Sequence, residues 1–292
     1  MSDLILGVDM SDAIARLVIV SAGGDVISQG IVTAVRANAI RDAANKAVAS
    51  ARGKITAVAI AVPSPSQEIA AEFLDAFAGI GTGQPAVISA GHAAAIAEQW
   101  RGAARGAAHV ISLSIAEHVT AGVLINGTPF MGAHGLASSI GWLALNPVER
   151  EDYRRLGGLE AEVAAAGIVR RFVWRIKSGD ESRVADQVKG DFTKISAADI
   201  LQGARSGDGV SISVMRDTGK YIGMAVANLA TIFDPEVIVL GGIIASSGDV
   251  MLEAIRAETA RRMLPQQVDQ IRIVLSTLGD DAVAIGAARS LA

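Results

Sequence analysis

The sequence contains no cysteine and few aromatic residues. Without cysteine the chain can form neither a disulfide nor a thiolate nucleophile, and it cannot hold a metal ion through sulfur. Aromatic residues make up 4% of the chain, whereas 51% of its 292 residues are hydrophobic. The core must therefore be built mainly from Ala, Val, Ile and Leu.

The sequence also lacks an excess of positive charge and a long apolar run. Its formal net charge is −4 at pH 7, and no basic run marks a surface for nucleic acid or membrane. No apolar stretch is long enough to predict a membrane span. The N-terminus opens on Asp3 and a short strand-like run, without the basic region of a signal peptide. We therefore expect a cytoplasmic protein with neither a nucleic-acid nor a membrane partner.

Strand-like and helix-like segments alternate along the chain. Apolar runs predict strands at residues 4–8, 15–21, 26–32, 55–62, 86–89, 110–114, 121–125, 235–242 and 271–275. Helical patterns occupy residues 37–51, 67–77, 93–101, 195–204, 215–233 and 281–291. Ser196 is a predicted N-cap with Asp199 three residues later, and Asn126–Gly127 predicts a hairpin turn. Two hairpin-led cycles of strands and helices indicate an α/β fold.

Several stretches, taken in order, resemble the ROK family of repressors, open reading frames and kinases. They are EQWRGAARGAAHVISLS (98–114), GVLINGTPFMGAHGLASSIGW (122–142), NLATIFDPEVIVLGGII (228–244) and LGDDAVAIGAARSL (278–291). In addition, GGLE at 157–160 stands where the family has Gly-Cys-Leu-Glu. The resemblance covers nearly the whole chain and implies an actin-like, ribonuclease-H-like α/β fold with two lobes around a central cleft.

The resemblance also implies how the chain is divided and what it assembles with. One lobe would comprise residues 1–108 with 281–292, and a larger lobe with a helical insertion would comprise residues 109–280. In the kinase members a sugar and ATP lie between the lobes. A homodimer or homotetramer and a sugar-like small-molecule ligand are the partners that the resemblance implies.

The stretch VISAGHAAAIAE (87–98) lies where the family has an Asn-Asp pair, whose Asp accepts the proton of the sugar hydroxyl. Ser89 stands at the Asn position, and Ala90 stands at the position of the base. Alanine accepts no proton, and a missing base costs roughly 10²–10⁴ in rate. His92 could act as a substitute base, but the simpler expectation is a helix N-terminal histidine satisfied by solvent.

The first phosphate loop that the resemblance implies follows Asp9. Ser11 and Asp12 occupy positions where glycines would let the backbone approach phosphate, and Ala13 occupies the position of a hydroxyl residue. Asp12 also adds a negative charge. Asp9 could coordinate Mg²⁺, but we expect it only to cap its own turn, because its partners are missing.

The second phosphate loop reads Gly-Thr-Gly-Ile-Gly in the family. Here the corresponding run begins Ala116, Glu117, His118, so an anion replaces the phosphate-binding hydroxyl. We expect His118 to be a solvated loop residue. The glycine pair Gly241–Gly242, which belongs to the same nucleotide side, is retained. Glycines at such positions permit turns and close packing.

The sugar side is altered in the same way. The family's Gly-Glu-Ile-Gly-His reads SSIGW here, so Ser139 replaces the sugar-binding Glu and Trp142 replaces the His that contacts metal and sugar. Trp142 could stack on a sugar face, although an apolar plug in a former pocket is the preferred interpretation. Glu160 is retained, with His134 in the neighbouring loop. Glu160 would either bind a polyol or pair a helix end.

The family's structural zinc motif has three cysteines around Gly-x-x-Gly, and the corresponding stretch reads EDYRRLGG at 151–158. No set of zinc ligands remains there, so we predict that no metal is bound. The arginine pairs at 154–155, 170–171 and 261–262 are most simply interpreted as solvated helix faces.

Together these substitutions predict a ROK-family sugar-kinase-like protein that is catalytically impaired. It would be a pseudoenzyme that needs no cofactor and acts as a carbohydrate-related binding, regulatory or oligomeric module. The family's repressors carry an N-terminal helix-turn-helix, and because the fold here is predicted to begin near residue 4, a DNA-binding repressor is disfavoured. The alternative is an active ATP-dependent carbohydrate kinase, similar to glucokinases or N-acetylhexosamine kinases, that uses ATP and Mg²⁺ with non-standard loops.

Overall fold

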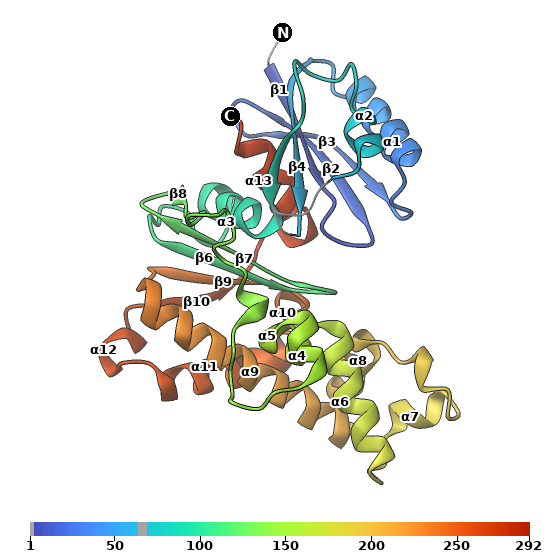
Figure 1. Ribbon diagram of the computed structural model, residues 1–292, viewed down its shortest axis with the longest axis vertical. Coiled ribbons are helices and arrows are strands. Elements are labelled where there is room, and N and C mark those ends of the chain that lie inside the picture. Colours follow the sequence, from blue (N-terminus) through green and yellow to red (C-terminus); the bar gives the residue numbers. More distant parts are fainter. Residues whose placement is uncertain (1–2, 64–68) are drawn as a thin grey trace. The chain divides into compact units, whose positions relative to one another are not determined.

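The computed structural model describes residues 3–63 and 69–292 (Figure 1). The chain forms two compact units. The first comprises the described residues up to 113 together with 120–139 and 276–292, and the second comprises 114–119 and 140–275. The start of the helix expected at 67–77 lies outside the described residues. The lobe boundaries implied by the family resemblance stay a prediction.

The first unit is built on a five-stranded sheet in the order β3-β2-β1-β4-β5. Its strands are β1 (Asp3–Asp9), β2 (Ala15–Ser21), β3 (Val26–Val32), β4 (Lys54–Val62) and β5 (Ala86–Ser89). The β1–β2 and β2–β3 pairs are antiparallel, whereas β1–β4 and β4–β5 are parallel. The predicted α/β fold, with its leading hairpin, is confirmed.

Helices cover both faces of this sheet, and its strands β1, β2 and β4 are mostly buried, whereas alternate residues of the edge strand β3 are exposed. They are α1 (Ala37–Ser50), α2 (Ala71–Asp75), α3 (Ala90–Arg101) and α13 (Ala282–Arg289). Alternate residues of β1 serve the two faces: Leu4 and Leu6 pack in the same cluster as Ile40 of α1, while Ile5 packs with Ala284 of α13. As expected, these clusters consist mainly of aliphatic side chains.

The close crossing of α13 over its neighbours depends on glycine. A Cβ atom on Gly286 would lie 1.7 Å from the carbonyl oxygen of Ala93 in α3, and one on Gly7 would lie 2.0 Å from the carbonyl oxygen of Ala284. No side chain fits at such distances. The retained Gly286 therefore serves backbone-to-backbone packing.

A second five-stranded sheet has the order β10-β9-β6-β7-β8. Its strands are β6 (Val110–Ile115), β7 (Val119–Ile125), β8 (Thr128–Pro129), β9 (Val237–Gly242) and β10 (Arg272–Leu275). β9 and β10 are parallel, and β7 and β8 form a hairpin. Asn126 and Gly127 turn this hairpin with φ values of 51° and 73°, which confirms the predicted turn.

The second unit is mostly helical. Its α-helices are α4 (Glu151–Leu156), α5 (Gly158–Val163), α6 (Ala165–Lys177), α7 (Arg183–Gln187), α8 (Ala197–Arg205), α9 (Gly209–Phe233), α10 (Ile243–Ser246), α11 (Gly248–Arg262) and α12 (Pro265–Val268). The 3₁₀ turns in the described residues are η1 (Ile140–Trp142), η2 (Phe192–Lys194) and η3 (Gly279–Asp281). Ser196 and Asp199 form the expected capping box at the start of α8.

Two helices begin earlier than predicted. The helix expected from residue 215 begins at Gly209, because the side chain of Asp208 accepts a hydrogen bond from the backbone N–H of Ser211 at 2.8 Å and caps it. The helix expected from residue 93 begins at Ala90, where Ser89 is the N-cap. In both cases a capping side chain marks the true start.

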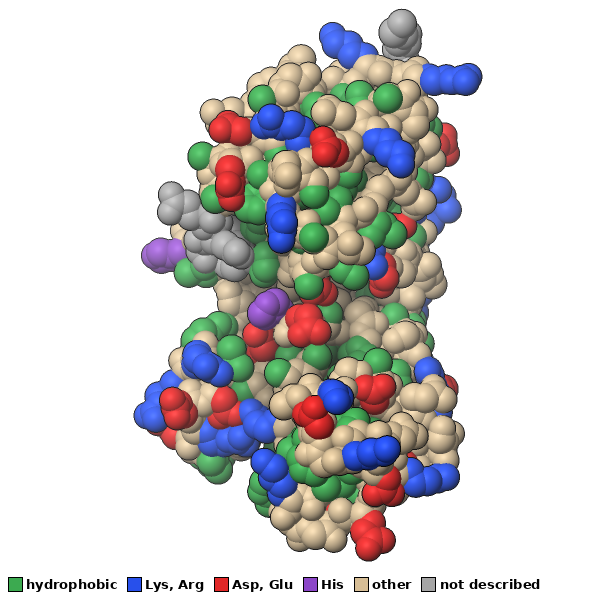
Figure 2. All heavy atoms as spheres, turned by 90° about the vertical axis from the view of Figure 1, so that its right-hand side faces the viewer, with side chains coloured by type: hydrophobic (Ala, Val, Ile, Leu, Met, Phe, Trp, Pro, Cys, Tyr) green, Lys and Arg blue, Asp and Glu red, His purple; other side chains and the backbone are tan. Residues whose placement is uncertain are grey.

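The surface carries both signs of charge. On the face drawn in Figure 2, Lys and Arg side chains are interspersed with Asp and Glu, without a broad field of one sign. Within residues 3–63 and 69–292, no helix combines the length and the apolar character that a membrane crossing requires.

Candidate functional site

Asp9 lies at the end of β1, where its side chain is buried. Its Oδ1 accepts hydrogen bonds from the backbone N–H of Ser11 at 2.9 Å and from the Ser11 hydroxyl at 2.6 Å. Burial raises the pKa of the Asp9 carboxyl, and the hydrogen bonds from Ser11 oppose that rise. As expected, the carboxylate caps its own turn.

The rest of this turn forms hydrogen bonds within itself and has no residue with a positive φ. Ser11 already donates its hydroxyl and its N–H to Asp9, and the N–H of Ala13 points to Oδ1 of Asp12 at 2.7 Å. None of residues 10–14 has a positive φ, so the turn lacks the backbone conformation that glycines would provide. The N–H and hydroxyl of Ser11 and the N–H of Ala13 are therefore occupied by carboxylates of the same loop.

Ala90, at the position expected for the base, begins α3 and is fully buried. Its methyl group packs in a cluster of buried alanines of the first unit: Ala59, Ala61, Ala93 and Ala287. A carboxylate at this position would therefore be buried beside these alanines.

His92 is fully buried, so the expectation of a solvent-satisfied histidine is wrong. Its Nε2 lies 3.1 Å from the carbonyl oxygen of Phe130, and its Nδ1 lies 2.6 Å from the hydroxyl of Ser89. Because a carbonyl oxygen only accepts, Nε2 must carry the proton, and Ser89 then donates to Nδ1. Ser89 also accepts from the N–H of His92, so both side chains are engaged in holding the start of α3.

The pH dependence of stability is expected to report this histidine. Burial lowers the pKa of His92, and the hydrogen bond to Phe130 opposes that change. Between the lowered folded pKa and the unfolded value of about 6.5 the unfolded chain binds more protons, so the free energy of unfolding falls as the pH drops through this range, by up to about 1.4 kcal/mol per pH unit. Urea unfolding between pH 7 and 5 should show this slope in the wild type and in His134→Gln, whose histidine is exposed. His92→Gln should lose it, and an unchanged slope in that variant would contradict the assignment.

The second loop, at Ala116–His118, joins β6 to β7. The side chain of Glu117 is exposed, and His118 Nδ1 lies 3.2 Å from Glu160 Oε1, with the His118 side chain 54% exposed. The other oxygen of Glu160 accepts from the N–H of Val119 at 2.9 Å. His118 is thus largely solvated as expected, and Glu160 ties α5 to the start of β7.

The retained glycine pair has a packing role at the end of β9. Gly242 has a φ of 64°, and a Cβ atom there would lie 2.0 Å from the carbonyl oxygen of Ile115. A Cβ atom on Gly241 would lie 3.3 Å from the hydroxyl oxygen of Ser114. Glycine is therefore required at 242 whether or not a nucleotide binds.

The residues predicted on the sugar side differ in exposure and in hydrogen bonding. Ser139 donates its hydroxyl to the carbonyl of Leu136 at 2.8 Å, and His134 is exposed. Ser138 keeps a glycine-like φ of 71°, and its hydroxyl is buried without a hydrogen-bond partner in the described part of the chain. Such strain persists only where the surrounding structure enforces it, so this loop holds Ser138 in a conformation that favours glycine.

Trp142 is not the apolar plug that the sequence favoured. Its residue is 60% exposed, and it lies in η1 beside a pocket of about 320 Å³ in the second unit. Aromatic, aliphatic and amide groups line this pocket together with two arginines and a glutamate; the lining includes Leu145, Asn146, Val148, Glu149, Arg150, Tyr153 and Arg154. The exposure of Trp142 permits the other interpretation, in which its indole ring stacks on a sugar face.

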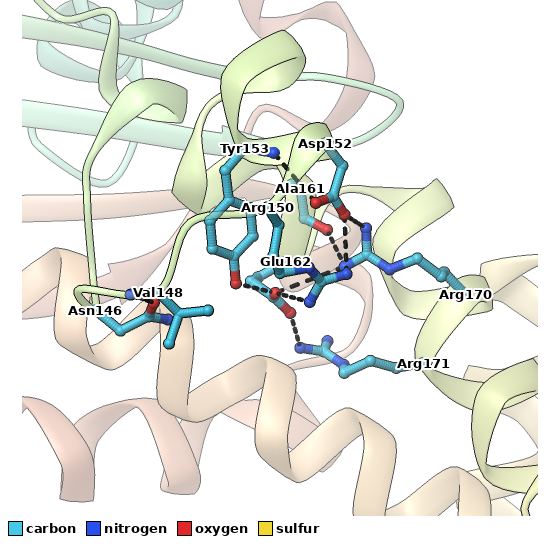
Figure 3. A network of polar contacts seen from close by, with 9 residues as sticks. All are labelled: Asn146, Val148, Arg150, Asp152, Tyr153, Ala161, Glu162, Arg170 and Arg171. Atoms are coloured by element: carbon cyan, nitrogen blue, oxygen red, sulfur yellow. Dashed lines mark hydrogen bonds and ion pairs between the residues drawn. The ribbon is translucent and has the colours of Figure 1, made fainter.

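A polar network replaces the zinc-motif region (Figure 3). The Glu162 side chain, which is 3% exposed, accepts from Arg150 at 3.2 Å, from the Tyr153 hydroxyl at 2.5 Å and from Arg171 at 3.0 Å. Asp152 binds Arg150 at 3.0 Å and also binds Arg170. We call these six residues the Glu162 network.

The Glu162 network joins the segment before α4 to α5 and α6. Arg171 continues it to α9, donating to the Thr218 hydroxyl at 2.5 Å. Burial lowers the pKa of Arg171, and Glu162 opposes that change. The expectation that the arginine pair 170–171 forms a solvated helix face is therefore wrong, because both residues bind carboxylates. In the described residues no group of three or more His, Asp or Glu side chains is arranged to hold a metal ion.

Solved structures with a similar fold include sugar kinases and a regulator. A ROK family glucokinase from Streptomyces griseus in complex with glucose and AMPPNP aligns with a TM-score of 0.80 and 23% identity, over 98% of each chain. A ROK family transcriptional regulator, a homolog of the E. coli MLC protein, aligns with a TM-score of 0.82 and 20% identity, over 99% of this chain and 77% of that one. The two-lobed actin-like fold is thus shown.

Sequence relatives point to the same family. A glucokinase from Halalkalibacterium halodurans is 32% identical over 198 residues, which cover 66% of this chain and 59% of the relative. The DNA-binding transcriptional dual regulator NagC of Escherichia coli is 29% identical over 194 residues, 66% of this chain and 46% of the relative. The match thus spans only about half to three-fifths of these relatives. The model of the ROK family matches residues 82–292, and the chain belongs to the ROK family.

Proposed function

We propose that this chain is a sugar-kinase-like ROK protein in which phosphoryl transfer is impaired, and that it acts as a carbohydrate-related binding or regulatory module. The observation that carries the proposal is Ala90, which is fully buried beside other alanines at the position that the resemblance assigns to the base. A phosphoryl transfer to a sugar needs a group that accepts the hydroxyl proton. His92 is a poor substitute, because its two nitrogens are engaged and it is fully buried.

The two altered loops support the same proposal. In the first, Asp9 and Asp12 accept the N–H groups of their own turn, so these donors do not face a ligand. In the second, the exposed carboxylate of Glu117 adds negative charge where the family has a hydroxyl residue. Phosphate binding needs free donors and positive potential. We therefore propose that neither ATP nor Mg²⁺ serves as a resident cofactor.

A sugar-like ligand is the partner that we propose, and the pocket beside Trp142 is its candidate site. The indole is exposed, so it can stack on the apolar face of a pyranose, while Asn146 and Arg154 can donate to hydroxyl groups. Arg150 is less available, because it binds Asp152 and Glu162. A homodimer or homotetramer remains part of the proposal, to be measured by analytical ultracentrifugation.

Calorimetry and a coupled assay of ADP release test the proposal. MgATP should bind to the wild type weakly or not at all, and glucose or N-acetylglucosamine should not stimulate ADP release at the rate of a kinase relative assayed in parallel. Glucose-type sugars without nucleotide should quench tryptophan fluorescence in the wild type but not in Trp142→Ala. Tight MgATP binding, or robust sugar-dependent ADP release, would overturn the proposed impairment.

The second candidate is an active carbohydrate kinase, which is favoured by the 32% identity to a glucokinase and by the retained Asp9. Sugar-dependent ADP release that is lost in Asp9→Asn would support it.

A relative that binds DNA raises the question of whether this chain also binds DNA. We propose that the described chain itself does not bind nucleic acid, since its net charge is −4, and a gel-shift assay at low salt with random duplex DNA tests this.

A further inference from the structure

The first unit contains a pocket of about 410 Å³ whose residues have no place in the proposed function. It is bordered by the end of α3, the loop that follows it, the β7–β8 turn and the end of α13. Its lining consists of Ile96, Gln99, Trp100, Gly106, Ala107, Ala108, Asn126, Gly127 and Arg289. No Asp or Glu belongs to this lining, and Arg289 is the charged residue in it. We call it the Arg289 pocket.

The aromatic wall of the Arg289 pocket is fixed by the fold. Gly24 has a φ of 96°, and a Cβ atom there would lie 2.1 Å from the ring of Trp100, so the ring occupies the space that glycine leaves. The guanidinium carbon of Arg289 lies 5.0 Å from the centre of the Trp100 ring, and that of Arg101 lies 5.6 Å from it. A cation at this distance from an indole is attracted to it, which holds the Arg289 side chain in place.

Arg289 differs from the other arginines of comparable burial. Arginines that are half-buried in the described residues usually bind a carboxylate, and four such pairs occur: Arg16–Asp280, Arg170–Asp152, Arg171–Glu162 and Arg175–Asp180. Arg289 is half-buried too, yet its guanidinium makes no ion pair or hydrogen bond with another described residue. Arg101, its neighbour on the ring, donates to the carbonyl of Gly24. The donors of Arg289 are thus left to the pocket.

We propose that the Arg289 pocket binds a small molecule through an oxyanion, either a phosphate monoester or a carboxylate. A guanidinium presents parallel N–H groups that match two oxygens of such a group. The side chain of Asn126, on the turn across the pocket, supplies an amide N–H with no protein partner among the described residues. The absence of acidic lining leaves the positive charge unopposed, and the volume is in the range of small-ligand sites. This proposal is independent of the phosphoryl-transfer question.

Calorimetry at low ionic strength with methyl phosphate and with propionate tests the proposal on the full chain. The wild type should bind at least one probe saturably at a single site, and the tighter probe identifies the class of oxyanion. Arg289→Gln should weaken binding at least ten-fold, and Arg289→Lys should bind with intermediate affinity. Arg36→Gln removes the same charge from an exposed arginine without a described partner and should bind like the wild type.

A second variant guards against a folding defect. Asn126→Asp keeps a residue that tolerates the left-handed turn conformation but places a negative charge at the pocket, so it should also weaken binding at least ten-fold. Far-UV circular dichroism verifies that each variant is folded. The proposal is overturned if neither probe saturates the wild type, or if folded Arg289→Gln or Asn126→Asp binds as tightly as the wild type.

Discussion

Replacing Glu162 with alanine is expected to lower the free energy of unfolding by about 3–5 kcal/mol, because the change leaves buried charges without their partner. The Glu162 network holds three guanidinium groups, from Arg150, Arg170 and Arg171, against two carboxylates. Without Glu162 the network would keep one carboxylate, that of Asp152, and the Arg171 side chain, which is 18% exposed, could not reach water easily. Urea unfolding at pH 7 measures the loss.

Glu149→Ala is the matched control for this prediction. The Glu149 side chain is 79% exposed and reaches Arg154 at 3.5 Å, so its loss should change stability by no more than about 0.5 kcal/mol. Equal losses in the two variants would contradict the role given to Glu162.

The Glu162 network can hold residues 151–158 in place without a metal ion, so a chelator should leave the melting temperature of the wild type unchanged. Stoichiometric zinc in the purified protein would argue against that.

Much of the fold could be predicted because its signals are local. Continuous apolar runs predict β1 and its hairpin partner, and the serine and aspartate at 196 and 199 mark the start of α8. Asp208 carries an equally local signal for the start of α9, whereas the apolar pattern by itself predicts a start at residue 215. Where a cap and a periodic pattern compete, the cap decides the boundary.

The side-chain partners could not be predicted, since they depend on contacts that spacing does not reveal. His92 finds the carbonyl of Phe130, which is 38 residues away, and this contact makes it a buried neutral side chain instead of a solvated one. The pair Arg170–Arg171 has the spacing of any exposed helix face, yet both residues turn toward acids on neighbouring segments. Whether a charged side chain is buried depends on the contacts of the folded chain, and these contacts cannot be inferred from the composition of the sequence.

The retained glycines and the lost polar groups have different physical explanations. Glycine is required at 286 and 242 because an added Cβ atom would lie 1.7 and 2.0 Å from a backbone carbonyl oxygen, so substitution would disturb packing even in a protein without activity. Positions 90 and 13 differ from these glycine positions, because each already carries a Cβ atom and so has no steric requirement for glycine. This contrast supports the proposal that the fold has been kept while the chemistry of phosphoryl transfer has been lost.

Restoring the base with Ala90→Asp is expected to cost about 3 kcal/mol or more at pH 7, because the new carboxylate would be buried among methyl groups. Burial would raise the pKa of that carboxyl, so the native state would bind the extra proton. Part of the loss should therefore be recovered as the pH falls, whereas Ala90→Asn, which has a similar volume, should show no such recovery. Urea unfolding at pH 5 and pH 7 separates the effect of charge from that of volume.

The same variant should not restore kinase activity, because the loops would still oppose the triphosphate. Asp12→Gly combined with Glu117→Thr removes two negative charges and frees the N–H of Ala13 from its aspartate, so this double variant should bind MgATP at least ten-fold more tightly than Ala90→Asp does. Asp75→Gly combined with Glu72→Thr makes the same exchange on α2 and should leave MgATP binding unchanged. Calorimetry measures both effects. If Ala90→Asp alone produced sugar-dependent ADP release, the loops would be competent, and the missing base would be the whole of the impairment.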